Sequence, residues 1–169
     1  MATYYVSKLG NDSNNGTSAA TAFLTIDKAA NEVASGDWVY IAPGTYRELV
    51  TMDTSGGINY GTTPEGWNTI QFFGDTEAKY FQGQGITPGV IRVTQAAAGT
   101  EAAGTSNSYV WNFNGKARIR VTNVIADGNA GSDDTSTVSR YAFRNSSNQY
   151  GIATINCTGI GSYGGFNNT

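Results

Sequence analysis

Histidine is absent from this chain of 169 residues, and cysteine occurs once. Without histidine the chain cannot supply a Ser-His-Asp or Cys-His triad, an imidazole base, or the usual histidine-containing zinc site. A single cysteine cannot form an internal disulfide, so the fold does not depend on one, and cysteine usage does not indicate a redox compartment. Cys157 lies in an alternating apolar run, which favours a buried, unreactive thiol.

Charge is also scarce. Only 14% of the residues are charged, and ten basic against thirteen acidic residues give a net charge of −3 and a pI near 4.8. This balance offers no basic surface for nucleic acid, so we expect no nucleic-acid partner. No stretch approaches the roughly 18 apolar residues of a membrane span, so we expect no membrane association either. The opening sequence MATYYVSKLGND lacks the basic and apolar regions of a signal peptide, which favours a protein that is not exported through a leader.

Small polar residues take the place of charge. Gly, Thr, Asn and Ser together make up 72 of the 169 residues, about 43% of the chain. Aromatic residues account for another 12%, and β-branched residues occur throughout, so this is not a disordered low-complexity segment. The length fits one domain with a real hydrophobic core.

One convincing helix is predicted near the N-terminus, after a short strand over 3–6 and a turn-rich loop. Thr25 is a suitable N-cap, Asp27 lies in the first turn, and apolar residues recur at helical spacing from Ile26 to Val33. The pattern predicts about ten helical residues, with Ser35-Gly36 ending the helix and Gly36 in the C′ position. So short a helix must pack on an apolar surface.

From Asp37 onward the hydrophobic period changes from 3.6 to 2, which predicts strands. Each run is short and is followed by turn-forming residues. The predicted strands cover 38–42, 46–52, 69–73, 90–94, 109–113, 117–125, 141–144 and 151–155. The central residues Ile41, Ile70, Ile91, Trp111 or Ile119, and Ile152 are spaced roughly 20 to 33 residues apart, which we interpret as a loose internal repeat.

Two all-β architectures suit short strands at this spacing. An antiparallel sandwich would use Asn114-Gly115 and Asp127-Gly128 as hairpin turns. A parallel β-solenoid would instead stack one coil on the next, with longer inserts projecting from one side. Irregular intervals and corners rich in Gly, Asn and Thr favour the solenoid.

The N-terminal quarter of the chain carries a family resemblance. The stretch TYYVSKLGNDSNNGTSAATAFLTIDKAANEVASGDWVYIAPGTYRE resembles the opening of pectate-lyase-like right-handed parallel β-helix proteins, most of all their phage tailspike and virion-type members. Later segments, KARIRVTNVIADGNA and QYGIATINCTGIGS, are similar to single coils of such helices. The resemblance implies an all-β, right-handed, single-stranded parallel β-helix of about five or six coils. It also implies that the short N-terminal helix caps the open end of the core.

Members of this fold include lyases, hydrolases and noncatalytic virion proteins, so the fold alone does not decide function. A lyase would need a Lys or Arg base and acidic calcium ligands. Arg118 and Arg120 alternate with apolar neighbours and are expected to share an outward face with Arg92. We interpret this set as a solvent-exposed ladder of arginines rather than a catalytic site.

A hydrolase would need converging carboxylates. The only acidic pair is Asp133-Asp134, which we interpret as part of a turn rather than a catalytic pair.

Aromatic residues give a further set of candidates. Trp38 and Trp111 are predicted to pack in or beside the core rather than to stack on sugar. Trp67 lies in the insert TTPEGWN, where contact with sugar, contact with a neighbouring subunit and local packing are all compatible with the sequence. Tyr60, Tyr80 and Phe81 lie in inserts too, as an oligomer interface would require. Asp75 is expected at a coil corner.

The sequence therefore predicts a single domain with two parts: residues 1–36, which hold the strand, loop and capping helix, and residues 37–169, which form the coils. We assign no catalytic, cofactor-binding or metal-binding residue and expect no cofactor. The favoured function is a noncatalytic structural protein of a bacteriophage virion surface, either a capsid decoration or a tail spike or fibre subunit, in contact with host polysaccharide. The alternatives are a polysaccharide lyase or glycoside hydrolase, and a bacterial surface carbohydrate-binding module.

The end of the sequence bears on partners. GIATINCTGIGSYGGFNNT keeps the coil-like pattern without a capping helix or a charged edge strand. We therefore expect self-association, with a trimer favoured, and contact with other virion proteins.

Overall fold

The chain forms a parallel β-helix. The computed structural model describes residues 1–57, 69–94, 108–128, 140–145, 151–160 and 166–168. In these ranges one α-helix, two 3-10 turns and thirteen strands occur. They are β1 Thr3–Val6, η1 Ala19–Thr21, α1 Ile26–Glu32, β2 Trp38–Ile41, β3 Gly44–Arg47, β4 Val50–Thr51, β5 Ile70–Gly74, η3 Lys79–Phe81, β6 Ile91–Thr94, β7 Ser108–Asn112, β8 Ile119–Thr122, β9 Ile125–Asp127, β10 Arg140–Asn145, β11 Ile152–Ile155, β12 Thr158–Ile160 and β13 Phe166–Asn168.

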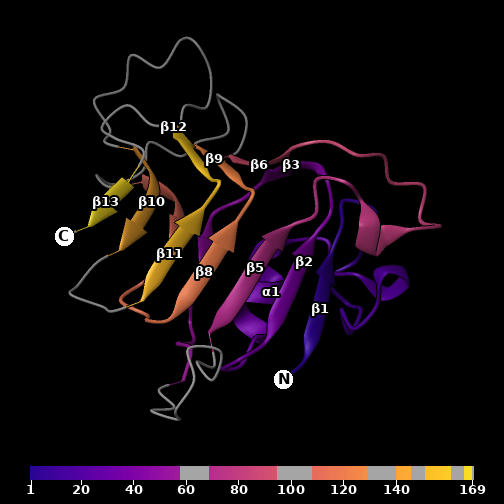
Figure 1. Ribbon diagram of the computed structural model, residues 1–169, viewed down its shortest axis with the longest axis horizontal. Coiled ribbons are helices and arrows are strands. Elements are labelled where there is room, and N and C mark those ends of the chain that lie inside the picture. The colour runs from indigo at the N-terminus through magenta and orange to yellow at the C-terminus, as the bar shows by residue number, and fades with distance from the viewer. Residues whose placement is uncertain (58–68, 95–107, 129–139, 146–150, 161–165, 169) are drawn as a thin grey trace.

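The strands build three sheets, and every pair of neighbouring strands is parallel. The sheet orders are β1-β2-β5-β8-β11, β12-β9-β6-β3 and β13-β10-β7-β4. Figure 1 shows the first sheet with its strands side by side in chain order. Each coil therefore gives one strand to each sheet, and the described residues hold four such coils after β1, fewer than the five or six expected. The solenoid prediction is confirmed, and neither Asn114-Gly115 nor Asp127-Gly128 joins antiparallel strands.

The predicted repeat is wrong as a measure of coil length. Along the first sheet, Val39 pairs with Phe72 and Phe72 pairs with Val121. One coil therefore runs from Val39 to Phe72, and the next runs from Phe72 to Val121. The reason is that one coil holds strands of all three sheets, such as β5, β6 and β7, and these strands look alike in the sequence. The run 46–52 likewise divides into β3 and β4, and the run 117–125 divides into β8 and β9, because the chain turns a corner inside each run.

Alternation along the strands places one face in the core. In β2, Val39 and Ile41 are fully buried, whereas Trp38 and Tyr40 point outward and are partly exposed. Inward residues of all three sheets meet in one hydrophobic cluster, as expected for a solenoid whose coils wrap around a common interior. Its largest fully buried members include Trp111, Tyr46 and Phe72.

Helix α1 is shorter than predicted. Its start is confirmed, because the Thr25 side chain accepts the Lys28 N–H at 3.2 Å and Asp27 lies in the first turn. The helix ends at Glu32, however, and Val33 is an extended C-cap rather than a helical residue. Gly36 is not the C′ residue; it occupies a separate turn with φ +87°.

This helix covers the N-terminal end of the coils. Ile26, Ala29 and Ala30 are buried in the common core. On the helix's flank, the Asp27 carboxylate accepts the Thr51 N–H of edge strand β4 at 2.9 Å. The Asp27 side chain thus satisfies a backbone N–H of an edge strand that could otherwise pair with another strand. Blocking such pairing is what a cap does.

The corner between the first and second sheets is formed by an asparagine stack, which we define as Gly74, Asn123 and Asn156. Asn123 and Asn156 have left-handed backbone angles, with φ of 58° and 49°. The Asn156 amide donates to the Asn123 side-chain oxygen at 2.8 Å, and the Asn123 amide donates to the Gly74 carbonyl at 3.2 Å. Three successive coils are therefore joined at the same corner, in addition to their strand ladders.

Candidate functional site

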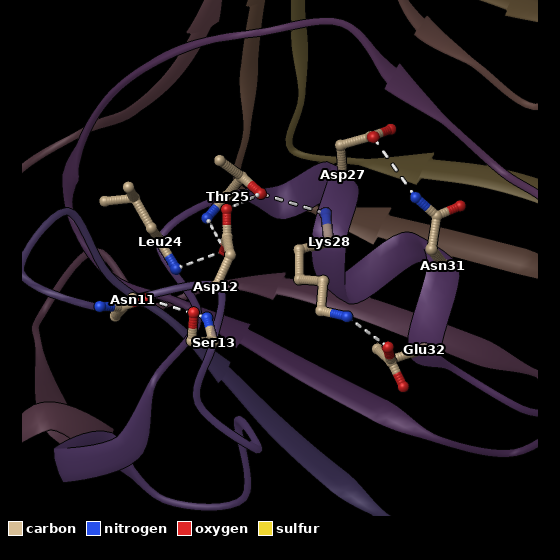
Figure 2. A network of polar contacts seen from close by, with 9 residues as sticks. All are labelled: Asn11, Asp12, Ser13, Leu24, Thr25, Asp27, Lys28, Asn31 and Glu32. Atoms are coloured by element: carbon tan, nitrogen blue, oxygen red, sulfur yellow. Dashed lines mark hydrogen bonds and ion pairs between the residues drawn. The ribbon is translucent and has the colours of Figure 1, made fainter.

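The carboxylates of the described residues mostly serve the fold. Asp12 lies under the segment before α1 and accepts hydrogen bonds from Leu24 N at 2.8 Å, Thr25 N at 3.0 Å and the Thr25 hydroxyl at 2.9 Å (Figure 2). Along the helix itself, Lys28 pairs with Glu32. The turn-rich loop GNDSN thus holds the cap in place through its aspartate.

Glu48 serves the same end of the molecule. Its two carboxylate oxygens accept hydrogen bonds from the Ile26 and Asp27 N–H groups at 3.0 and 2.8 Å. These N–H groups have no partner within the helix, because they lie in its first turn. Burial raises the pKa of Glu48 above its usual value, and the two backbone donors oppose that rise without cancelling it. A carboxyl with a raised pKa can signal a catalytic acid, but these contacts show a helix cap.

Two more acids are buried at corners. Asp37 accepts N–H groups from Ala2 and Ala34, and Asp75 accepts the Tyr80 N–H at 2.7 Å. Both aspartates are almost inaccessible to solvent. The prediction that Asp75 is a corner residue is confirmed, since it directly follows β5 and its N–H donates to the Ile41 carbonyl.

Asp127, the last residue of β9, is also buried, and it contacts a side chain of the same sheet. It forms an ion pair with Arg92, whose side chain is 40% exposed. Thr45 pairs with Arg92 and Thr94 pairs with Asp127, so the surface along β3, β6 and β9 exposes Thr45 and part of Arg92, whereas Thr94 and Asp127 are buried. The ion pair combines a guanidinium with one carboxylate, which can orient sugar hydroxyls but does not provide the two carboxylates of a glycosidase.

The expected ladder of Arg92, Arg118 and Arg120 is wrong. Arg120 lies on β8 in the first sheet, where its partners are Gln71 and Ala153, whereas Arg92 lies on β6 in the second sheet. Arg118 precedes β8 with a left-handed φ of 56°. Alternation in the sequence placed the Arg120 side chain outward correctly, but it could not tell which sheet each strand joins.

An aromatic cluster covers the outer face of the first sheet. Tyr80 stacks on Tyr40 with ring centroids 3.8 Å apart, and the edge of Phe73 meets both rings. Phe81 is buried and meets Tyr5 edge to face at 5.8 Å. The insert after β5 thus folds back on its own sheet, so the prediction that Tyr80 and Phe81 serve an oligomer interface is wrong for Phe81, whose ring is used internally.

Burial in this cluster changes the chemistry of one hydroxyl. Desolvation and the neighbouring Tyr80 hydroxyl raise the pKa of Tyr40 to about 12, so the phenol stays protonated at neutral pH. The stacking contact with Tyr80 makes Tyr40 a packing residue of this cluster.

The two described tryptophans have different roles. Trp111 is fully buried against Phe72, with centroids 5.2 Å apart, which confirms its place in the core. Trp38 is not a core residue; it lies on the outer face beside Tyr40, at 6.2 Å, and is partly exposed. Its strand partner Gln71 is also partly exposed, and Gln71 in turn pairs with the exposed Arg120. We call Trp38, Gln71 and Arg120 the outer row.

Cys157 is partly buried against the core, and desolvation raises the pKa of its thiol. A raised pKa keeps the thiol protonated and weakly nucleophilic, in line with the predicted inert role.

Tyr60, Trp67, Asp133 and Asp134 lie outside the described residues. Within the described ranges, no group of three or more His, Cys, Asp or Glu side chains could hold a metal ion. No helix in that part of the chain is long and apolar enough to cross a membrane.

Comparison with solved structures supports the fold. Two crystal structures of the GH136 lacto-N-biosidase from Eubacterium ramulus, a selenomethionine derivative and the native protein, match with TM-scores of 0.64 and 0.60, at 16% and 15% identity. They cover 92% and 91% of this chain, which spans 26% of the enzyme in both cases. At this identity the likeness shows the β-helix fold alone.

A third match, the complex of XylC with xylose, shares 26% identity over 54% of this chain and 11% of the other. Its TM-score of 0.39 is too low to carry an argument. No protein-family model matches the chain, and no curated protein matches it either. The fold is therefore an all-β parallel β-helix, while its place among pectate-lyase-like or virion proteins remains a prediction.

The features that sequence reasoning missed are contacts between distant segments. Glu48 was included in the matching stretch only as the last letter of APGTYRE, yet it caps a helix that begins 22 residues earlier. Gln71 could not be predicted as a site residue, because a lone glutamine in a strand carries no signal. Its position between Trp38 and Arg120 follows only from the register of three strands.

Proposed function

We propose that this chain is a noncatalytic structural β-helix of a bacteriophage virion surface that contacts glycans without cleaving them. The observation that carries the noncatalytic role is the use of the carboxylates. Asp12, Asp37, Glu48 and Asp75 all bind backbone N–H groups of caps and corners. Acids engaged in this way are not available as a catalytic acid and base.

The outer faces support contact with glycans. They offer partly exposed rings, amides and hydroxyls with few charges, the composition that recognises sugar hydroxyls and sugar faces. The virion location rests on the sequence resemblance and on the wealth of Asn, Gly, Ser and Thr. The predicted trimer belongs to the same proposal.

The enzyme alternative has one observation in its favour. Arg92 and Asp127 form an ion pair between β6 and β9. In a lyase the guanidinium would have to take the proton, but here it is engaged in an ion pair with Asp127. This pair therefore favours binding over proton abstraction.

The virion role is tested on particles of a phage that encodes this chain. Gold-labelled antibody against the purified protein is expected to decorate a fixed position on the capsid or tail in electron micrographs. Analytical ultracentrifugation of the purified chain is expected to show a trimer. Unlabelled particles from which the protein is also absent by mass spectrometry would contradict the proposal.

A further inference from the structure

The outer row forms a binding site for a sugar that carries a carboxylate, we infer, and this inference rests on the proposed noncatalytic contact with glycans. The row consists of Trp38 on β2, Gln71 on β5 and Arg120 on β8. Parallel pairing places Trp38 opposite Gln71, and Gln71 opposite Arg120. An aromatic ring, an amide and a guanidinium thus lie in line across three coils.

The spacing of the row suits a short oligosaccharide. Neighbouring strands lie about 4.8 Å apart, so the strand positions of Trp38 and Arg120 are separated by roughly 10 Å. A ligand of two or three sugar rings spans that distance along the axis of the solenoid. It would place one ring on Trp38 and its acidic group at Arg120, with Gln71 between them as donor and acceptor.

The cluster beside the row defines one border of the site. Tyr80 and Phe81 cover the following positions of β1, β2 and β5, where Tyr40 and Tyr5 lie beneath them. Trp38 lies beside this cluster, with its ring centroid 6.2 Å from that of Tyr40. A rigid aromatic neighbour holds the indole in position, so little side-chain entropy is lost when a sugar stacks on it.

Charge identifies the class of ligand. Arg120 is exposed, and in the described part of the chain no carboxylate forms an ion pair with it; the three pairs found there involve Met1, Lys28 and Arg92 instead. A planar guanidinium binds a carboxylate through two parallel hydrogen bonds. The protein's net charge of −3 disfavours polyanions such as nucleic acid, so the row suits a ligand that presents one carboxylate at a time.

The test is calorimetric titration of the purified protein with a hyaluronan hexasaccharide and with its carboxyl-reduced counterpart. The two ligands differ in charge but not in ring number. We expect saturable binding of the acidic ligand and at least about tenfold weaker binding of the reduced one, because the reduced ligand cannot form the charge-assisted contact with Arg120.

Variants separate the row from general charge effects. Arg120→Gln and Trp38→Ala are each expected to weaken binding at least about tenfold. Arg144→Gln removes a partly exposed arginine from β10, in the third sheet, and is expected to leave binding unchanged. Trp38→Phe keeps a stacking face, so it should retain part of the affinity even if Trp38→Ala proves unstable.

Each outcome decides a separate claim. Absence of binding, equal binding of the two ligands, or full affinity in Arg120→Gln would overturn the inference while leaving the noncatalytic role intact. Binding accompanied by shortening of the oligosaccharide, followed by chromatography, would overturn the noncatalytic role while leaving the outer row in place.

Discussion

Gly74 lies where two coils approach closely in the asparagine stack. A Cβ atom on Gly74 would come within 2.5 Å of the Asn123 carbonyl oxygen, which is backbone and cannot turn aside. Glycine is therefore required at this corner by space rather than by a left-handed backbone. The resulting close approach lets the Asn123 amide reach the Gly74 carbonyl.

Replacing this glycine tests the corner directly. We expect Gly74→Ala to lower the free energy of unfolding by about 1–3 kcal/mol, the usual cost of forcing extra volume into a packed site. Gly89→Ala is the matched control, since its Cβ would meet Pro43 at an ordinary 3.5 Å. Urea denaturation followed by circular dichroism measures both. Equal stability of the two variants would contradict the packing of this corner.

Helix α1 depends on an acid from the next coil. The raised pKa of Glu48 means that the folded protein holds the Glu48 proton more tightly than the unfolded chain does. The stabilisation linked to this proton is fully present below the ordinary carboxyl pKa and is lost as pH rises through the raised value. Glu48 is thus expected to make the folded state less stable as pH increases over that window.

The prediction concerns the difference between wild type and Glu48→Gln. The stability of the wild type relative to Glu48→Gln should fall as pH rises from the ordinary carboxyl pKa to the raised one, because the variant does not titrate there. Denaturant melts at a series of pH values provide the measurement. Glu77→Gln, at an exposed position in the insert, is the control and should follow the wild-type profile. Parallel profiles for wild type and Glu48→Gln would exclude this linkage.

The asparagine stack can be divided into backbone and hydrogen-bond contributions. Asn123→Ala removes the hydrogen bond to the Gly74 carbonyl and leaves alanine at a left-handed φ of 58°, which a residue with a Cβ atom adopts only with strain. Asn123→Gly removes the same bond but tolerates the angle. We expect the alanine variant to be the less stable of the two by about 1 kcal/mol, and the glycine variant to be less stable than wild type. Thermal melts decide it; if both variants match wild type, the stack does not stabilise the coils.

At the scale of the whole molecule, the N-terminal cap was predictable because its signals are local. Thr25 and Asp27 mark the helix start within three residues, and alternation in WVYIA marks the first strand that follows. The choice between sandwich and solenoid came from the turn composition and from the resemblance. The length of a coil was not predictable in this way, because the three strands of one coil look alike in sequence.

The candidate sites show the same division. That Arg120 points outward follows from its apolar neighbours Ile119 and Val121. That it lines up with Trp38 depends on pairing between strands far apart in the sequence, from β2 to β5 and from β5 to β8, which no local pattern encodes. The burial of Phe81 was likewise hidden, because the insert that carries it resembles a projecting loop until its packing on Tyr5 is known.

The proposed noncatalytic role rests on four described acids, Asp12, Asp37, Glu48 and Asp75, which hold caps and corners of the fold. The most direct measurement is release of product from a panel of acidic and neutral polysaccharides, followed by reducing ends for hydrolysis and by ultraviolet absorbance of unsaturated uronates for elimination. We predict no product above that of a heat-denatured sample, with binding retained. Steady release of either product by the pure protein would contradict this role.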